Sequence, residues 1–470
     1  VSAGATAQIA QFVAAATYAG LPQRVIAAAK DSFLDTLGIA IAGAVEPGGR
    51  LVSKYVAQAG GAAVSSLIGA GIKVPARAAA EANGTLAHVV GFSDFSVPNV
   101  LHPSVAVLPA VWAVAEAVRA SGRDVLLAHA VGVEVSCKIM RVLTPEFTQR
   151  GFHPCAIVGT FGAAAAAAKL LGLDATGIAN ALGIAGQRAA GIKVSLGTMS
   201  KAYAVGNAAA GGVAAAELAR IGYTGAVDVL EGRDGFFQTF GAGVEAADLQ
   251  DLLAHPWEFE SPGITIKPYP ACTRSHPAID AALAVKGRIA DVDAIERVSC
   301  RVAPAVMQVV KVARPRNAME AKFSLPFCLA AALLDGEVVM DTFTEAKLSS
   351  DAIQAFMSRV RPEAVESLAA RGPFAAEVTV TLRDGANLQA SADRNLWDDP
   401  SAATPEKRAQ LESKFMSCAT RVLSFAEAER ALALANALEH EPDIERLMAL
   451  ACRTKSPTPE DGSASSKRRG

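Results

Sequence analysis

The sequence predicts a large all-α helical domain together with a smaller α+β domain. Up to residue 264, apolar residues recur at intervals of three and four, Ser or Asp precedes several of these segments, and Gly closes several. Over 265–399, short runs alternate β-branched and polar residues, which is typical of strands. Helical spacing returns over 400–455, so we expect this stretch to rejoin the first domain. Residues 456–470 are polar and rich in Ser, Pro and Gly, which predicts a disordered tail.

Seven segments of the first domain show helical spacing, and two more follow residue 400. We expect helices over 7–20, 23–44, 77–92, 105–122, 123–143, 161–173, 204–222, 405–424 and 425–452. In the smaller domain we expect strands within 264–271, 295–302 and 376–391, and helices over 276–290 and 323–336. The segment 376–391 holds Arg-Asp-Gly-Ala between two alternating runs, which predicts a hairpin.

Composition excludes several classes of function. The 470 residues are 51% hydrophobic but only 6% aromatic, so we expect a large core of small side chains and closely packed helices. Lys and Arg number 44 against 46 Asp and Glu, and no basic stripe is interleaved with aromatic residues, so nucleic-acid binding is not expected. Gly, Pro or charged residues interrupt every long apolar run, and no charged signal region opens the sequence. We therefore expect neither a membrane span nor a secretory signal.

The cysteines are scattered and odd in number. There are seven, and none belongs to a Cys-x-x-Cys pair. This pattern predicts a reducing, cytoplasmic compartment, and it argues against a zinc site or an iron–sulfur cluster, whose ligands usually lie close together in sequence.

Ionisable residues stand beside Gly or Pro at the ends of several predicted helices, where a helical domain can gather polar groups. Asp94 and His102 lie in one such stretch, and His102 precedes Pro103 at a helix start, where a neutral imidazole is favoured. His153 repeats the His-Pro pattern in "GFHP". A capping or packing role for these histidines remains open.

Two further stretches supply cationic groups. Lys201 lies among small residues before a Gly/Ala-rich helix, where its ammonium either reaches solvent or binds an anion. The segment "GITIKPYPACTRSHPAID" at the domain boundary concentrates polar groups between prolines, so we expect it to face the substrate. Its candidate substrate-binding residues are Lys267, Tyr269, Arg274 and His276.

This inventory suits proton chemistry on a small polycarboxylate. Lys201, Lys267 and Arg274 could neutralise carboxylates, while the two histidines could move protons near neutral pH. A C–H bond beside a carboxylate is only weakly acidic, so removal of its proton requires cations that stabilise the enediolate.

Five motifs together resemble the MmgE/PrpD family, which contains 2-methylcitrate dehydratase, cis-aconitate decarboxylase and iminodisuccinate epimerase. The resemblance runs from about residue 5 to 450 and rests on "HPSVAVLPA", "GFHPCAIVGTFGAAAAAAKLLGL", "GTMSKAYAVGNAAAGG", "EGRDGFFQTF" and "KPYPACTRSHPAID". It implies a homodimer, no cofactor and an active site between the two domains. Catalytic residues carried over by motif are His102, His153 and Lys201, and Lys267 and His276 match the boundary motif.

The sequence departs from the family pattern in two places. In "HVVGFSDFS", Gly91 and Ser93 replace two family Asp residues, Asp94 keeps the third, and Phe95 replaces Thr, and the segment before His102 is one residue longer. In "AKFSLPFCLAAALL", Phe327 stands where many members carry Tyr.

These losses predict a changed substrate or acid/base partner, since each missing hydrogen bond to a charged group is worth roughly 1.5–3 kcal/mol. We expect a cofactor-independent lyase, of dehydratase or decarboxylase type, acting on a small di- or tricarboxylate. One histidine would act as base and the other as acid. The alternatives are an epimerase of the iminodisuccinate type, which needs a base on each face of one carbon, and a non-catalytic binding protein with the same fold.

Overall fold

The structure is a computed structural model that describes residues 4–143, 146–241, 253–394 and 404–454. The described residues divide into two compact units, the first within 1–266 and 400–470 and the second within 267–399. The predicted disordered tail, 456–470, lies outside the described residues.

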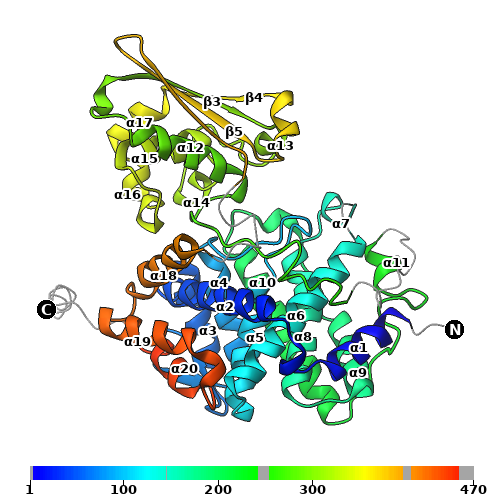
Figure 1. Cartoon of the computed structure of the whole chain (residues 1–470). Coiled ribbons are helices and arrows are strands. Elements are labelled where there is room, and N and C mark those ends of the chain that lie inside the picture. Colours follow the sequence, from blue (N-terminus) through cyan, green and yellow to red (C-terminus); the bar gives the residue numbers. More distant parts are fainter. Residues whose placement is uncertain (1–3, 144–145, 242–252, 395–403, 455–470) are drawn as a thin grey trace, which may run out of the picture. The chain divides into compact units, whose positions relative to one another are not determined.

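The first unit is helical, which confirms the predicted class of this part of the chain (Figure 1). Its described α-helices are α1 (Ala5–Ala15), α2 (Gln23–Gly43), α3 (Pro47–Ala59), α4 (Ala76–Val89), α5 (Ser104–Val118), α6 (Gly122–Leu143), α7 (Glu146–Gln149), α8 (Pro154–Leu170), α9 (Ala175–Gly186), α10 (Ser200–Arg220), α11 (Phe236–Phe240), α18 (Pro405–Ala419), α19 (Phe425–Asn436) and α20 (Glu445–Ala451). A small antiparallel hairpin, β1 (Ser65–Leu67) and β2 (Ile72–Val74), also belongs to it. Within the described residues, no helix is both long and apolar enough to cross a membrane.

Small residues let the central helices of this unit approach closely. Helix α10 packs along both α4 and α8. A Cβ added at Gly212 of α10 would lie only 2.5 Å from the Cβ of Ala163 on α8, and one at Gly206 would lie 2.1 Å from the backbone oxygen of Glu81 on α4. The absence of side chains at these glycines therefore allows the three helices to touch, and their ends carry the candidate site.

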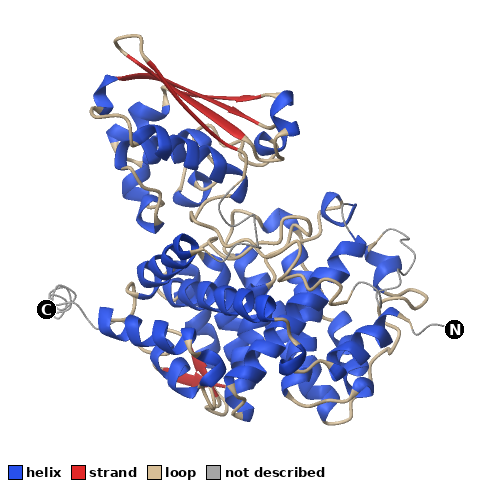
Figure 2. Ribbon diagram, viewed as in Figure 1, coloured by secondary structure: helices blue, strands red, loops and turns tan. Residues whose placement is uncertain are grey.

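The second unit is an α+β structure with a four-stranded mixed sheet (Figure 2). Its strands are β3 (Ile295–Val302), β4 (Val360–Ala364), β5 (Ala376–Leu382) and β6 (Asn387–Ala392), in the order β4-β3-β5-β6. Strand β3 pairs in parallel with β4 and antiparallel with β5, and β5 forms the predicted hairpin with β6. The described α-helices are α12 (His276–Lys286), α13 (Pro304–Met307), α14 (Ala318–Ala321), α15 (Leu325–Asp335), α16 (Glu345–Leu348) and α17 (Asp351–Met357).

Helices α12 and α15 pack on each other and against this sheet, which closes the core of the second unit. Short 3₁₀ turns complete both units. They are η1 (Tyr18–Gly20), η2 (Lys193–Ser195), η3 (Thr273–Ser275), η4 (Val292–Ala294), η5 (Met340–Thr342), η6 (Glu366–Ala370) and η8 (Leu438–His440).

The prediction of a strand within 264–271 is wrong. Only Thr265 forms a bridge, with Phe95, and the rest of the segment is irregular. Pro268 and Pro270 have no backbone N–H to donate to a ladder, so β-branched residues beside them cannot continue one.

Other elements escaped the sequence analysis. Helix α3 begins with Pro-Gly-Gly, which reads as a turn, although proline fits the first position of a helix. Strand β4 contains Pro362 and lies at the edge of the sheet, where a missing donor is tolerated.

Candidate active site

Three histidines meet at helix ends in the first unit. His88 is the second-last residue of α4, His102 lies just before the start of α5, and His153 occupies the N-cap position of α8 without a capping hydrogen bond from its side chain. The ring centroid of His88 lies 5.2 Å from that of His102 and 6.2 Å from that of His153. His102 and His153, which the sequence indicated separately through the His-Pro pattern, are therefore gathered around His88. His88 was missed because it lies inside an apolar helical pattern.

The backbone orients the ring of His102. Its Nδ1 lies 2.5 Å from the carbonyl oxygen of Asp94. A carbonyl oxygen can only accept, so Nδ1 carries the hydrogen and Nε2 of the neutral ring is the proton acceptor. The hydroxyl of Ser93, which no sequence pattern marked as a site residue, lies 3.3 Å from the same Nδ1 and 3.5 Å from Nδ1 of His88.

His153 is held in the neutral form. Burial, and after it the positive charges of Lys201 and Lys193, lower its pKa to about 4. Its Nδ1 is buried with no hydrogen-bond partner among the described residues. At neutral pH this imidazole therefore has a buried nitrogen with unused hydrogen-bonding capacity.

Positive potential converges on these rings. The N-termini of α5 and α8 meet where the backbone N–H of His102 donates to Sγ of Cys155, at 3.3 Å. Lys201 lies in the first turn of α10. Lys193, which no sequence pattern marked as a site residue, donates to the backbone oxygen of Thr148 at 2.9 Å. Helix N-termini and ammonium groups both attract anions, so this place suits a carboxylate.

Asp94 turns its carboxyl group into the protein interior. The side chain is fully buried, and its Oδ2 accepts a hydrogen bond of 2.5 Å from Oγ of Ser32. Hydrogen bonds of 2.9 Å continue from Ser32 to Ser104 and from Ser104 to Nε2 of His129. Burial raises the pKa of Asp94 to about 6 and lowers that of His129 to about 3. A substrate contact for Asp94 stays a prediction, whereas its backbone already positions His102.

The loop between α4 and α5 is anchored by the C-terminal part of the chain. Nζ of Lys414, on α18, lies 2.5 Å from Oδ1 of Asp35, donates to the backbone oxygen of Phe92 at 2.9 Å, and sits 3.7 Å from the centre of the Phe92 ring. Gly91 in this loop has a φ of +75°, a left-handed conformation that favours glycine over the Asp found at this place in the family pattern.

Two candidates of the second unit lie at one carbonyl group, and a third packs against one of them. Nζ of Lys267 and Nε2 of His276 lie 3.5 and 3.3 Å from the backbone oxygen of Ala271, and both side chains are buried. The ring of Tyr269 stands edge-on to that of His276, with centroids 5.4 Å apart. The Tyr269 hydroxyl donates to Oδ1 of Asp280 at 2.5 Å, and burial together with this carboxylate raises its pKa.

Two further residues that the sequence singled out in this unit, Arg274 and Phe327, make contacts within the unit. Arg274 donates to the backbone oxygen of Ala305 at 2.5 Å and lies over the ring of Phe374. Phe327 is fully buried and packs against Phe343. Substrate binding by Arg274, as by Lys267, Tyr269 and His276, stays a prediction.

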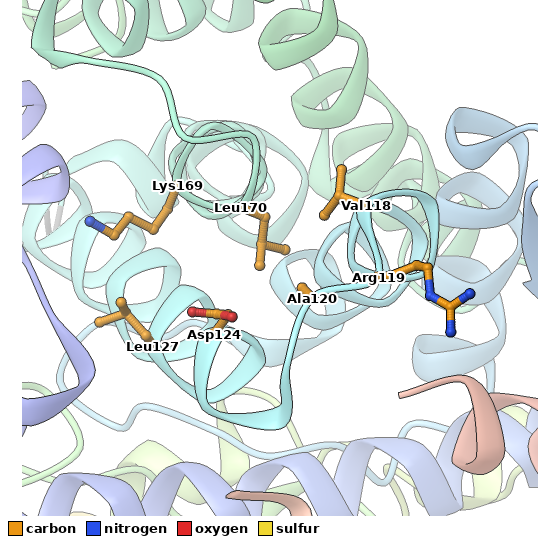
Figure 3. Close-up of a pocket in the computed structure, with 7 residues that line it drawn as sticks. All are labelled: Val118, Arg119, Ala120, Asp124, Leu127, Lys169 and Leu170. Atoms are coloured by element: carbon orange, nitrogen blue, oxygen red, sulfur yellow. The ribbon is translucent and has the colours of Figure 1, made fainter. Parts of the chain in front are cut away.

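A pocket of about 340 Å³ opens elsewhere in the first unit (Figure 3). The residues that line this pocket include Arg119, Lys169 and Asp124. Arg119 follows the end of α5, Lys169 belongs to the last turn of α8, and Asp124 lies in the first turn of α6. His102 and His153 stand at the opposite ends of α5 and α8, so this pocket is separate from the histidine cluster.

Comparison with known proteins extends over nearly the whole chain. Residues 7–248 match the MmgE/PrpD N-terminal domain, and residues 269–440 match the MmgE/PrpD C-terminal domain. The cis-aconitate decarboxylase of Homo sapiens is 32% identical over 95% of this chain and 93% of its own length, and that of Mus musculus is 30% identical over 94% and 91%. The cis-aconitate decarboxylase of Aspergillus terreus is 26% identical over 97% of both chains. The chain belongs to the MmgE/PrpD family.

Proposed function

We propose that this lyase of the MmgE/PrpD family decarboxylates a small tricarboxylate of the cis-aconitate type without a cofactor. The observation that carries the proposal is the position of His102 and His153 at the N-termini of α5 and α8, together with the charges of Lys193 and Lys201 that act on His153. The activity named for the human and mouse relatives supports the same substrate class.

The chemistry requires stabilised negative charge and one delivered proton. Loss of CO₂ from the carboxylate on the CH₂ group of cis-aconitate leaves an electron pair, which spreads over the neighbouring double bond and the carboxylate at its far end. A proton then adds to the far alkene carbon. Cations near the carboxylates stabilise the intermediate, so the two lysines and the helix N-termini serve the step that breaks the C–C bond.

We assign the proton transfer to His102. The Asp94 carbonyl holds the hydrogen on Nδ1, so Nε2 can receive a proton and pass it on. The negative charge of a bound tricarboxylate favours the imidazolium form, which converts this base into the acid that the reaction needs. His153, kept neutral by burial and the lysines, would act as a hydrogen-bond partner of the substrate.

A direct assay tests the proposal. The full chain is incubated with cis-aconitate in deuterated water, and ¹H NMR follows the product while released CO₂ is measured. We expect one deuterium in each product molecule and a large loss of turnover in His102→Asn and His153→Asn. Turnover unchanged in both variants would contradict the assigned site. Deuterium exchange without CO₂ release would point to an epimerase instead.

We also propose that the chain forms a homodimer. Large apolar side chains are exposed close to the candidate site, including Val194 at 82%, Ile192 at 59% and Met199 at 53% exposure. Burying such side chains against a second copy is favourable. Sedimentation analysis is expected to show a dimer that Val194→Asp weakens, and a monomeric wild type would contradict the proposal.

A further inference from the structure

Three metal-ligating side chains meet at the start of α8. One ligand atom from each of His88, His153 and Cys155 lies within 4.8 Å of the other two. The three residues are 1%, 5% and 2% exposed. Nδ1 of His153 is buried and has no hydrogen-bond partner in the described part of the chain. The proposed reaction uses His153 but gives no role to the Cys155 thiol.

The donor atoms select a class of ion. Two imidazole nitrogens and one thiolate suit Zn²⁺ and similar thiophilic cations, whereas Mg²⁺ and Ca²⁺ prefer oxygen ligands. Bonds of about 2.0–2.1 Å to nitrogen and about 2.3 Å to sulfur place tetrahedral ligand atoms about 3.5 Å apart. The three atoms, which now lie within 4.8 Å of one another, would close to that distance when they bind one ion. A fourth position would stay open to water or a carboxylate.

We propose that His88, His153 and Cys155 bind one thiophilic divalent cation, represented by Zn²⁺, and that this cation reversibly inhibits the enzyme. Binding breaks the S–H bond of Cys155, forms a metal–sulfur bond and releases the proton to solvent. The bound ion coordinates the ring of His153, which is then no longer available to the substrate. It also lies beside His102, whose backbone N–H donates to Cys155. The inhibition rests on the proposed function, whereas the binding does not.

Cobalt binding tests the site directly. The full chain, freed of metal with a chelator, is titrated with Co²⁺ while absorbance records the thiolate-to-cobalt charge-transfer band and the visible bands of tetrahedral cobalt. We expect one equivalent to bind and Zn²⁺ to displace it.

Cys155→Ser is expected to lose the charge-transfer band and to weaken binding by at least about 100-fold, because the loss of mere outer-shell partners already costs 10–100-fold. Cys418→Ser, which removes a buried thiol on α18, is the matched control and is expected to retain both properties.

Two outcomes overturn the site. One is a wild type that binds Co²⁺ without a charge-transfer band. The other is a band that survives in folded Cys155→Ser, because the sulfur would then come from another cysteine, such as the less buried Cys272 or Cys452. X-ray absorption of the Zn²⁺-loaded wild type needs no variant. One sulfur and two imidazole ligands are expected there, and the absence of sulfur refutes the proposal.

Turnover separates inhibition from the proposed function. Zn²⁺ is expected to inhibit the metal-free wild type, a chelator to restore its activity, and Cys155→Ser to resist inhibition. If the cobalt site forms but no tricarboxylate is turned over, the proposed function fails and the site stands. If turnover is present and Zn²⁺ binds without reducing it, the inhibition is refuted.

Discussion

The buried ion pair between Lys414 and Asp35 provides a sharp test of how the site loop is held. The two side chains are 6% and 0% exposed, and the charged atoms lie 2.5 Å apart. Lys414→Met leaves the Asp35 carboxylate buried without its counter-charge, which typically costs about 3–5 kcal/mol. Lys414→Met also removes the cation–π contact with the Phe92 ring, and such a contact is worth about 2 kcal/mol when it is desolvated. We count this loss within the same range. We therefore expect the free energy of unfolding to fall by about 3–5 kcal/mol.

Urea unfolding at pH 7, followed by far-UV circular dichroism, measures this loss. Adding Asp35→Asn to Lys414→Met removes the uncompensated charge, so the double variant is expected to recover most of the stability. Arg446→Met is the exposed control, because the side chain that pairs with Glu441 is 72% exposed, and its cost is expected to stay below about 1 kcal/mol.

The same variant has a functional consequence. Lys414 holds the backbone oxygen of Phe92, two residues before the carbonyl of Asp94 that orients His102. Turnover is therefore expected to fall in Lys414→Met even at temperatures where the variant is fully folded. A stability loss below about 1 kcal/mol, or a double variant no more stable than the single one, would refute the reasoning.

Three further predictions follow from the buried groups and the helix packing. Burial raises the pKa of Asp94 to about 6, so the folded protein keeps a proton on this carboxyl group that the unfolded chain releases, and the contribution of Asp94 to stability is expected to fall between pH 4 and 6. Asp94→Asn should remove this contribution, so that the difference in unfolding free energy between variant and wild type changes by on the order of 3 kcal/mol between urea titrations at pH 4 and pH 7. Burial and then Lys201 lower the pKa of His153, so Lys201→Met is expected to raise that pKa above about 4 in an NMR titration, and an unchanged value would contradict the contact. Gly212→Ala should lower the free energy of unfolding by about 1–3 kcal/mol in thermal unfolding, because its Cβ would overlap α8. Gly287→Ala, whose Cβ meets nothing closer than 3.8 Å, should cost nothing, and equal losses in both would refute the packing argument.

Local sequence patterns predicted the fold class and two of the candidate catalytic residues. Helical spacing and the Arg-Asp-Gly-Ala turn act over a few residues, so the helical class and the β5–β6 hairpin could be predicted directly. His102 and His153 stood out because each precedes a proline at a helix start, which is also a local feature. The prediction of a strand within 264–271 was wrong because Pro268 and Pro270 have no backbone N–H to donate to a strand ladder.

What the sequence by itself determined is the identity of the elements and the presence of neutralising and proton-transferring residues at their ends. Only the tertiary structure decided which of them meet. His88 joins His153 and Cys155 across more than 60 positions, and Lys414 reaches Phe92 across 322. These contacts depend on how closely the helices pack, and that closeness is set by glycines whose missing side chains face distant segments. The spacing of residues along the sequence reflects local backbone preferences, within about one turn of a helix. Contacts between residues that lie far apart in the sequence are determined by how the helices pack.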